Sequence, residues 1–171
     1  MSHLNVEIKA RCPDPERVRA ALRERNADFR GTDRQTDTYF RCARGRLKLR
    51  EGTIENALIH YHRENRTGPK TSRVLLVPVE PGSLMREALA SALGVLATVQ
   101  KDREIYFIDN VKFHVDRVEG LGSFVEIEAI DRDGSIGEPR LRRQCESFLE
   151  ALGISDSDLL THSYSDMLLE P

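Results

Sequence analysis

The stretch Leu4-Asn5-Val6-Glu7-Ile8-Lys9-Ala10-Arg11 has apolar residues at its even positions and polar or charged residues at its odd positions. Successive side chains of a β-strand point to opposite faces of the sheet. The alternation therefore predicts a strand with one apolar face and one charged face. Because the charged face includes both Glu7 and Lys9, it carries both signs of charge.

The same alternation recurs along the chain, at residues 46–50, 113–116 and 124–128. Basic residues share a face in the first of these stretches, and carboxylates share a face in the last. One surface of the predicted sheet therefore combines cations with carboxylates. Such a surface suits a polyphosphate bound together with its metal ion.

Apolar periodicity and breaker residues predict an α+β fold with helices at both ends of the chain and near its middle. Asp14 is expected to cap the first helix, and Ser83 the second, with Gly94 just beyond the end of the second. The expected helices are 14–26, 83–93, 139–152 and a short one from 156, and the expected strands are 35–42, 46–51, 55–64, 72–79, 95–108, 110–118 and 123–130, in addition to the first.

The apolar stripes of the helices must pack on the apolar strand faces, so the charged face must look the other way. Two geometries satisfy this requirement: an open sheet with one solvated face, and a closed barrel with a polar lumen. The pattern favours the barrel, because a solvated face would tolerate Ser, Thr and Gln, whereas nearly every such position here is charged. Many short antiparallel strands can also close without leaving exposed edges.

Composition limits the function. The 171 residues suit one domain, expected to span 1–171, and 39% of them are hydrophobic. With 26 basic and 28 acidic residues the net charge is −2, which argues against nucleic-acid binding. Three cysteines without a CxxC pair indicate a reducing cytoplasm rather than a disulfide scaffold. No apolar signal segment or membrane-length apolar run is present, so no membrane association is expected.

Four carboxylates lie on the predicted polar face: Glu7, Asp116, Glu126 and Glu128. Divalent cations such as Mg²⁺ and Mn²⁺ bind to a few carboxylates and to substrate phosphates. Glu126 and Glu128, two residues apart on one face, could reach the same ion. The alternative is that each carboxylate pairs with a neighbouring Lys or Arg across the sheet.

The matching cations are Lys9, Lys48, Arg50, Arg63, Lys101 and Arg103. In a partly buried setting two unit charges at ~4 Å interact by about 4 kcal/mol at an effective dielectric constant near 20. Cations converging on one cavity would therefore repel one another unless an anion such as a triphosphate compensated them. On an open face, water and salt would screen this repulsion and no ligand would be required.

Other motifs carry less weight. The spacing of His60 and His62 is compatible with a metal site, but such histidines are more often surface or packing residues. The segment 68–71 resembles the end of a phosphate-binding P-loop but lacks its first glycine. Four aromatic residues are expected to pack rather than to stack on a base: Tyr39, Tyr61, Tyr106 and Phe107.

Taken in order, several motifs resemble the CYTH family, the triphosphate tunnel metalloenzymes, which include class IV adenylyl cyclases and thiamine triphosphatases. The resemblance covers nearly the whole chain and is closest to the cyclase-like branch. It implies a closed eight-stranded antiparallel β-barrel, with helices outside it and a lumen that binds a triphosphate. The matching segments are 5–11, 35–40, 45–51, 101–104, 114–128 and 163–166.

The resemblance also implies roles for the residues. Glu7, Lys9 and Asp116 fall on catalytic positions. The metal positions, for Mg²⁺ or Mn²⁺, fall on Glu7, Asp116, Glu126 and Glu128. The phosphate positions fall on Lys9, Lys48, Arg50, Lys101 and Arg103, while Arg63 and Arg73 lie on strands that could reach the lumen and match less closely.

The family motif ExExK reads Asn5-Val6-Glu7-Ile8-Lys9 here, so an amide replaces the first glutamate. This departure puts a second metal ion, and hydrolysis by an activated water, in doubt. The resemblance implies a cyclase that converts ATP to cyclic AMP and pyrophosphate, and a homodimer. The alternatives are an inorganic or thiamine triphosphatase and a non-catalytic nucleotide- or polyphosphate-binding module.

Overall fold

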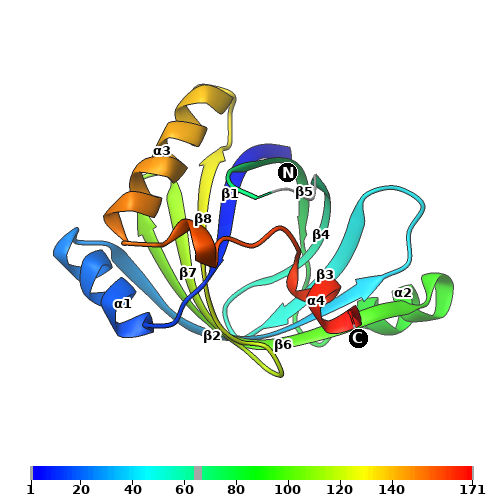
Figure 1. The fold of residues 1–171 in the computed structure, drawn as a ribbon. Helices are drawn as coiled ribbons and strands as arrows, with labels where there is room; N and C mark the ends of the chain where they lie inside the picture. Colours follow the sequence, from blue (N-terminus) through cyan, green and yellow to red (C-terminus); the bar gives the residue numbers. More distant parts are fainter. Residues whose placement is uncertain (1, 64–66, 171) are drawn as a thin grey trace.

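The computed structural model describes residues 2–63 and 67–170, in which eight strands form a closed antiparallel barrel (Figure 1). The order around the barrel is β1-β5-β4-β3-β2-β6-β7-β8, and pairing between β8 and β1 closes it. The strands are β1 (Ser2–Arg11), β2 (Asp28–Phe40), β3 (Arg46–Gly52), β4 (Asn56–Arg63), β5 (Lys70–Pro78), β6 (Val95–Ile108), β7 (Val111–Val118) and β8 (Gly122–Asp131). The predicted α+β barrel is confirmed, and the open sheet is excluded.

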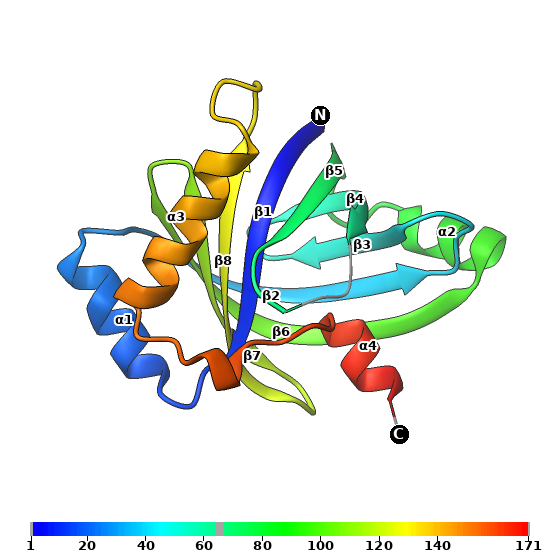
Figure 2. The same cartoon turned by 45° about the horizontal axis from the view of Figure 1, so that its top comes forward.

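Helices lie outside the barrel (Figures 1 and 2). Helices α1 and α3 pack beside β1, β7 and β8. Helix α2 lies beside the end of β2 and the start of β6, and α4 lies at one end of the barrel. None of the described helices has the length and apolar character needed to cross a bilayer. The helices are α1 (Pro15–Glu24), α2 (Met85–Leu93), α3 (Glu138–Ala151) and α4 (Tyr164–Leu169), with a 3-10 turn at Asp156–Asp158.

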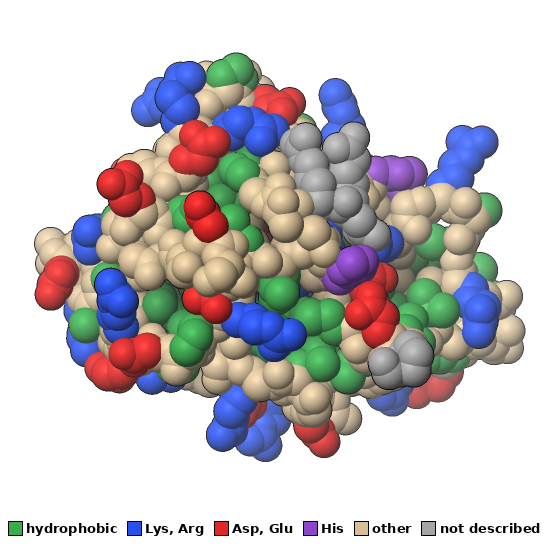
Figure 3. Space-filling model, viewed as in Figure 1, with side chains coloured by type: hydrophobic (Ala, Val, Ile, Leu, Met, Phe, Trp, Pro, Cys, Tyr) green, Lys and Arg blue, Asp and Glu red, His purple; other side chains and the backbone are tan. Residues whose placement is uncertain are grey.

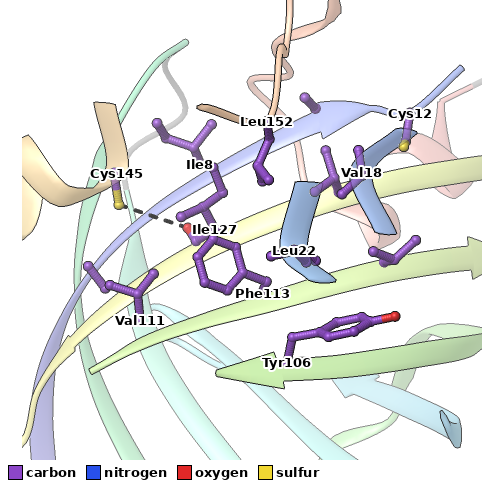
Figure 4. Close-up of a cluster of buried hydrophobic side chains, with 14 of the residues drawn as sticks. Ile8, Cys12, Val18, Leu22, Tyr106, Val111, Phe113, Ile127, Cys145 and Leu152 are labelled. Carbon is purple, nitrogen blue, oxygen red and sulfur yellow. Dashed lines mark hydrogen bonds between the residues drawn. The ribbon is translucent and has the colours of Figure 1, made fainter. Parts of the chain in front are cut away.

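The main hydrophobic core lies between α1, α3 and the outer faces of β1, β7 and β8 (Figure 4). Val6 and Ile8 contribute the apolar face of β1, and Leu22, Phe113 and Ile127 are fully buried against it. Burying one such large side chain stabilises the fold by about 1.5–3 kcal/mol. Because these residues point outward to the helices, their neighbours along each strand must point into the lumen.

Most predicted element boundaries are close to those observed. The Asp14 side chain accepts a hydrogen bond from Arg17 N at the start of α1, as expected of a cap. Gly94 ends α2 with a φ of 80°, a left-handed conformation that glycine adopts without strain. The prediction that Ser83 caps α2 is wrong. Ser83 N bonds to Glu80 O at the end of a tight turn, so the helix begins only at Met85.

The second strand differs most from the prediction, because β2 begins at Asp28 rather than at Gln35. Its first residues mix Phe29 and Gly31 with polar side chains and lack a sustained alternation, so residues 28–34 were not predicted to belong to a strand. The ladder to the long strand β6 holds them, from Asp28 opposite Phe107 to Phe40 opposite Val95. The predicted end of the fourth strand falls on residues 64–66, which lie outside the described residues.

Candidate active site

A cavity of about 440 Å³ occupies the barrel lumen, and charged side chains from six of the strands and from adjoining turns line it. Among the described residues of this lining, basic ones outnumber acidic ones. The basic residues are Lys9, Lys48, Arg50, Arg63, Lys101, Arg103, Lys112 and Arg132, and the acidic residues are Glu7, Glu55, Glu126 and Glu128. The excess of positive charge fits an anionic ligand better than a bare metal ion.

The cavity brings together all the residues predicted for the site except Asp116 and Arg73. Asp116 is 1% exposed and lies behind Arg103 rather than in the cavity lining. Along β5, Ser72 and Val74 line the cavity, so Arg73 between them points outward and is exposed. Arg11, which alternation places on the same strand face as Lys9, is exposed at the end of β1 and does not reach the lumen.

The wall formed by β1 and β8 concentrates the carboxylates. Glu7 lies opposite Glu128 in the register of the two strands, and Lys9 lies opposite Glu126. Lys9 Nζ is 2.6 Å from Glu126 Oε1, and Arg63 forms an ion pair with Glu7. Glu7 and Glu128, in contrast, are like charges on directly facing positions, which is destabilising without a compensating cation.

Glu128 differs from Glu7 and Glu126 in having a raised pKa. Burial, together with Glu7 and Glu126, raises the pKa of Glu128 despite the opposing charge of Lys112. Asn5 donates a side-chain hydrogen bond to Glu128 but brings no positive charge. A divalent cation near these glutamates would relieve the repulsion.

The donor set therefore fits Mg²⁺ or Mn²⁺, which prefer oxygen ligands. Within residues 2–63 and 67–170, no three His, Cys, Asp or Glu side chains are arranged to hold an ion by themselves. Substrate phosphates and water would have to complete the coordination, as is usual for Mg²⁺.

Glu126 also contacts two further groups besides Lys9. Arg103 Nη2 lies 3.3 Å from Glu126 Oε2, and His114 Nδ1 lies 2.9 Å from the same oxygen. Although burial raises it, Lys9 and Arg103 hold the pKa of Glu126 well below its usual range. Burial and Arg103 lower the pKa of His114 to about 4, so its imidazole is neutral near pH 7 and donates from Nδ1 to Glu126. Glu126 thus orients three side chains of the lumen.

Both carboxylate oxygens of Asp116 have hydrogen-bond partners. Arg103 donates from Nε to Oδ1 at 2.8 Å and from Nη2 to Oδ2 at 2.6 Å, and the Tyr164 hydroxyl donates to Oδ2 at 2.7 Å. This bidentate geometry fixes the guanidinium plane. In this arrangement Asp116 orients Arg103.

Asp37 plays a similar part for three other cations. It is fully buried and accepts two hydrogen bonds from Arg50, at 2.9 and 2.8 Å, and one from Lys101 at 2.8 Å. Lys48 Nζ lies 3.3 Å from the same carboxylate. Burial raises the pKa of Asp37, but these cations lower it far more, to well below its usual range. Asp37 therefore holds the cations that face the β1–β8 wall.

Sequence reasoning missed several of these residues. Asp37 alternates with Gln35 and Tyr39 on β2, so strand parity alone could have placed it inside the barrel. Lys112 alternates with His114 in the same way, and it forms an ion pair with Glu55. Glu55 follows a turn and Tyr164 follows an irregular segment, so no periodicity marked these two. Arg132 comes directly after β8 and continues the alternation of Glu126 and Glu128, so it could have been found.

The aromatic and histidine predictions can also be compared with the structure. Tyr39, Tyr61 and Tyr106 belong to hydrophobic clusters, as predicted, although Tyr39 and Tyr61 also line the cavity. His60 alternates with the cavity-lining residues of β4, which places it on the outer face, and its Nε2 lies 2.9 Å from Arg44 O.

Lys101 is expected to take up a proton when a polyanion binds. Burial lowers the pKa of Lys101 to about 7 despite its bond to Asp37, so the amine is largely neutral at pH 8 in the free protein. A bound anion favours the charged form. Calorimetric titration with inorganic triphosphate at pH 8, in two buffers of different ionisation enthalpy, should show net proton uptake that is reduced in Lys101→Met. Identical heats in both buffers would contradict this expectation.

Residues 3–164 match the sequence profile of the CYTH domain. The chain belongs to the CYTH family. Among curated proteins, this CYTH chain is 32% identical to the adenylate cyclase CyaB of Aeromonas hydrophila, over 93% of the chain and 85% of that protein.

Solved structures support the same fold. A candidate adenylate cyclase from Vibrio parahaemolyticus superposes with a TM-score of 0.77 at 16% identity, covering 99% of this chain and 100% of that one. A candidate adenylyl cyclase from Hippeastrum, described as having a dominant triphosphatase activity, gives a TM-score of 0.60 at 17% identity, covering 96% and 94%. At these identities the likeness shows the CYTH barrel and leaves the reaction open.

Proposed function

We propose that this CYTH protein is a divalent-metal-dependent enzyme that binds a nucleoside triphosphate in the barrel lumen and converts ATP to cyclic AMP and pyrophosphate. The observation that carries the proposal is that eight basic side chains in the described part of the chain converge on one cavity of about 440 Å³. A triphosphate, with several negative charges, compensates their mutual repulsion. The cyclase relative from Aeromonas hydrophila supports the reaction type.

The cations of the lumen would bind and orient the phosphates. Asp37 fixes Arg50 and Lys101, and Asp116 fixes Arg103, so these cations are held before the ligand arrives. A site organised in advance stabilises developing charge without reorganising during the reaction. Holding the ribose 3′-hydroxyl near the α-phosphorus lowers the barrier further, because the two reacting atoms are already oriented for attack.

The reaction forms a bond between the 3′ oxygen and the α-phosphorus and breaks the bond to the bridging oxygen of the β-phosphate. Pyrophosphate leaves, and the 3′-hydroxyl proton passes to solvent. Glu7, Glu126 and Glu128 are the residues that would hold Mg²⁺ or Mn²⁺. Such an ion, when bound, supplies positive charge at the phosphates and lowers the pKa of a nearby hydroxyl.

Hydrolysis of a terminal phosphate is the second candidate, because the Hippeastrum neighbour is described as predominantly a triphosphatase. The test is to incubate the purified protein with ATP, inorganic triphosphate and thiamine triphosphate, each with Mg²⁺ or Mn²⁺, and to identify the products. Cyclic AMP with pyrophosphate supports the cyclase, whereas orthophosphate without cyclic AMP supports a triphosphatase. Tight binding without turnover under either metal would identify a binding module and refute both enzymatic functions.

We further propose that the protein acts in the cytoplasm as a homodimer and binds neither membrane nor nucleic acid. Cys12, Cys42 and Cys145 are all free thiols, which suits a reducing compartment. On the face shown in Figure 3, basic and acidic side chains are interspersed rather than separated by sign. Light scattering of the purified protein would test the dimer directly.

Asn5→Glu is expected to strengthen metal binding and to weaken the metal-free fold. The new carboxylate would lie beside Glu128, which already faces Glu7. The melting temperature without metal should fall, and the increase on adding Mn²⁺ should exceed that of the wild type. Asn5→Gln, which keeps the amide, is the matched control. An unchanged response to Mn²⁺ in Asn5→Glu would argue against a metal at this wall.

A further inference from the structure

One side chain of the C-terminal segment contacts a cation of the cavity lining and also the carboxylate that orients a second lining cation. The ring of Tyr164 lies beneath Lys9, with Nζ 3.4 Å from the ring centroid, and the Tyr164 hydroxyl donates to Asp116 Oδ2 at 2.7 Å. Tyr164 is the first residue of α4, whereas Lys9 and Asp116 belong to β1 and β7. The tyrosine is 2% exposed, so both contacts are shielded from bulk water.

The contact with Lys9 restricts the directions open to its ammonium group. An ammonium carries three N–H donors. One is directed to Glu126 Oε1 at 2.6 Å, and the face of the Tyr164 ring attracts the cation on another side. The remaining donor capacity of Lys9 is available to a ligand in the cavity that Lys9 lines.

The contact with Asp116 acts on Arg103. Asp116 holds the Arg103 guanidinium by two hydrogen bonds, and the Tyr164 hydroxyl adds a third hydrogen bond to the same carboxylate. This third bond limits rotation of the carboxylate, and therefore of the guanidinium plane that it holds. Arg103 lines the cavity on the side where Glu126 contacts both it and Lys9.

The segment that carries Tyr164 is itself firmly attached. Ser163 and Asp166 form a capping box at the start of α4, and Arg46 of β3 donates to Ser163 Oγ at 2.5 Å and to Asp166 Oδ2 at 2.8 Å. Leu160 N bonds to Lys9 O at 2.9 Å. The tyrosine is therefore fixed relative to β1 and β3 before any ligand binds.

We propose that Tyr164 is a positioning residue that fixes the directions of Lys9 and, through Asp116, of Arg103 toward the phosphates of the substrate. The inference rests on the proposed function, because it requires that the lumen bind a triphosphate. It adds the C-terminal segment to the active site.

The test measures binding of inorganic triphosphate to the full chain by calorimetry without divalent metal, so that no turnover occurs. Tyr164→Phe removes the bond to Asp116 and keeps the ring, and the dissociation constant should rise by about 5-fold. Tyr164→Leu removes both contacts, and it should rise by about 30-fold. Leu169→Ala, an exposed position of α4, is the control and should leave binding unchanged.

A double-mutant cycle separates positioning from direct contact with the ligand. If Tyr164 acts partly through Lys9, Tyr164→Leu should weaken binding less in the Lys9→Ala background than in the wild type. Fully additive effects would overturn the inference. If Tyr164→Leu does not fold, Tyr164→Phe provides the same comparison for Asp116 in an Asp116→Asn background.

Failure of this inference can be told apart from failure of the proposed function. If the wild type binds triphosphate neither without metal nor with Mg²⁺, the proposed function fails, and this inference fails with it. If the wild type binds and the folded Tyr164 variants bind equally well, with only a lower melting temperature, then the tyrosine is structural and the inference alone is overturned.

Discussion

Glu126→Gln is expected to lower turnover by about 100- to 1,000-fold while leaving the barrel folded. Glutamine has the same shape and keeps one oxygen acceptor for Lys9. It loses the negative charge that holds Lys9 at 2.6 Å, Arg103 at 3.3 Å and the His114 ring at 2.9 Å. It also removes one of the three glutamates proposed to hold the metal. Steady-state rates of product formation, with circular dichroism as the check on folding, measure the effect.

Two further variants make this experiment specific. Lys9→Ala removes the partner of Glu126 and should lower turnover to a similar extent, because both residues line one cavity. Glu146→Gln removes a carboxylate from the exposed surface of α3 and should leave turnover unchanged. Near-normal rates in both Glu126→Gln and Lys9→Ala would remove the lumen from consideration as the active site.

Asp37→Asn is expected to lower the free energy of unfolding by about 3–5 kcal/mol, because it leaves buried cations without their counter-charge. Arg50 and Lys101 both bond to this carboxylate, and Lys48 lies 3.3 Å from it. The free energy of unfolding from urea titration measures the loss. Inorganic triphosphate should stabilise the variant, since the anion replaces part of the missing charge.

The pH dependence of stability gives a second test of Asp37. Its pKa is well below the usual value in the folded protein, so its contribution is complete above a pH of about 4, the unfolded value, and is lost as the pH falls further. The wild type should therefore lose more stability on acidification than Asp37→Asn. Equal slopes in the two proteins would show that the carboxylate is not held by these cations.

The period-two alternation of the strands was enough to predict much of the lumen. Because side chains alternate strictly along a strand, Glu7 and Lys9 had to share a face, as did Lys48 and Arg50, once Val6, Ile8 and Leu49 were assigned to the other. Where alternation was absent, prediction failed. The start of β2 and the cap of α2 depend on a partner strand and on a local turn.

The amino-acid sequence by itself determined which face of several strands turns into the barrel, because burial of one strand face dictates the orientation of the other. The tertiary structure decided which charges meet. Asp37 reaches Lys101, and Arg63 reaches Glu7, only because the barrel closes strands that are distant along the chain. Tyr164 meets Lys9 because the C-terminal segment packs back against β1, where Leu160 N bonds to Lys9 O. Parity is a local property of the backbone, whereas the pairing of charges across a lumen depends on strand order and closure.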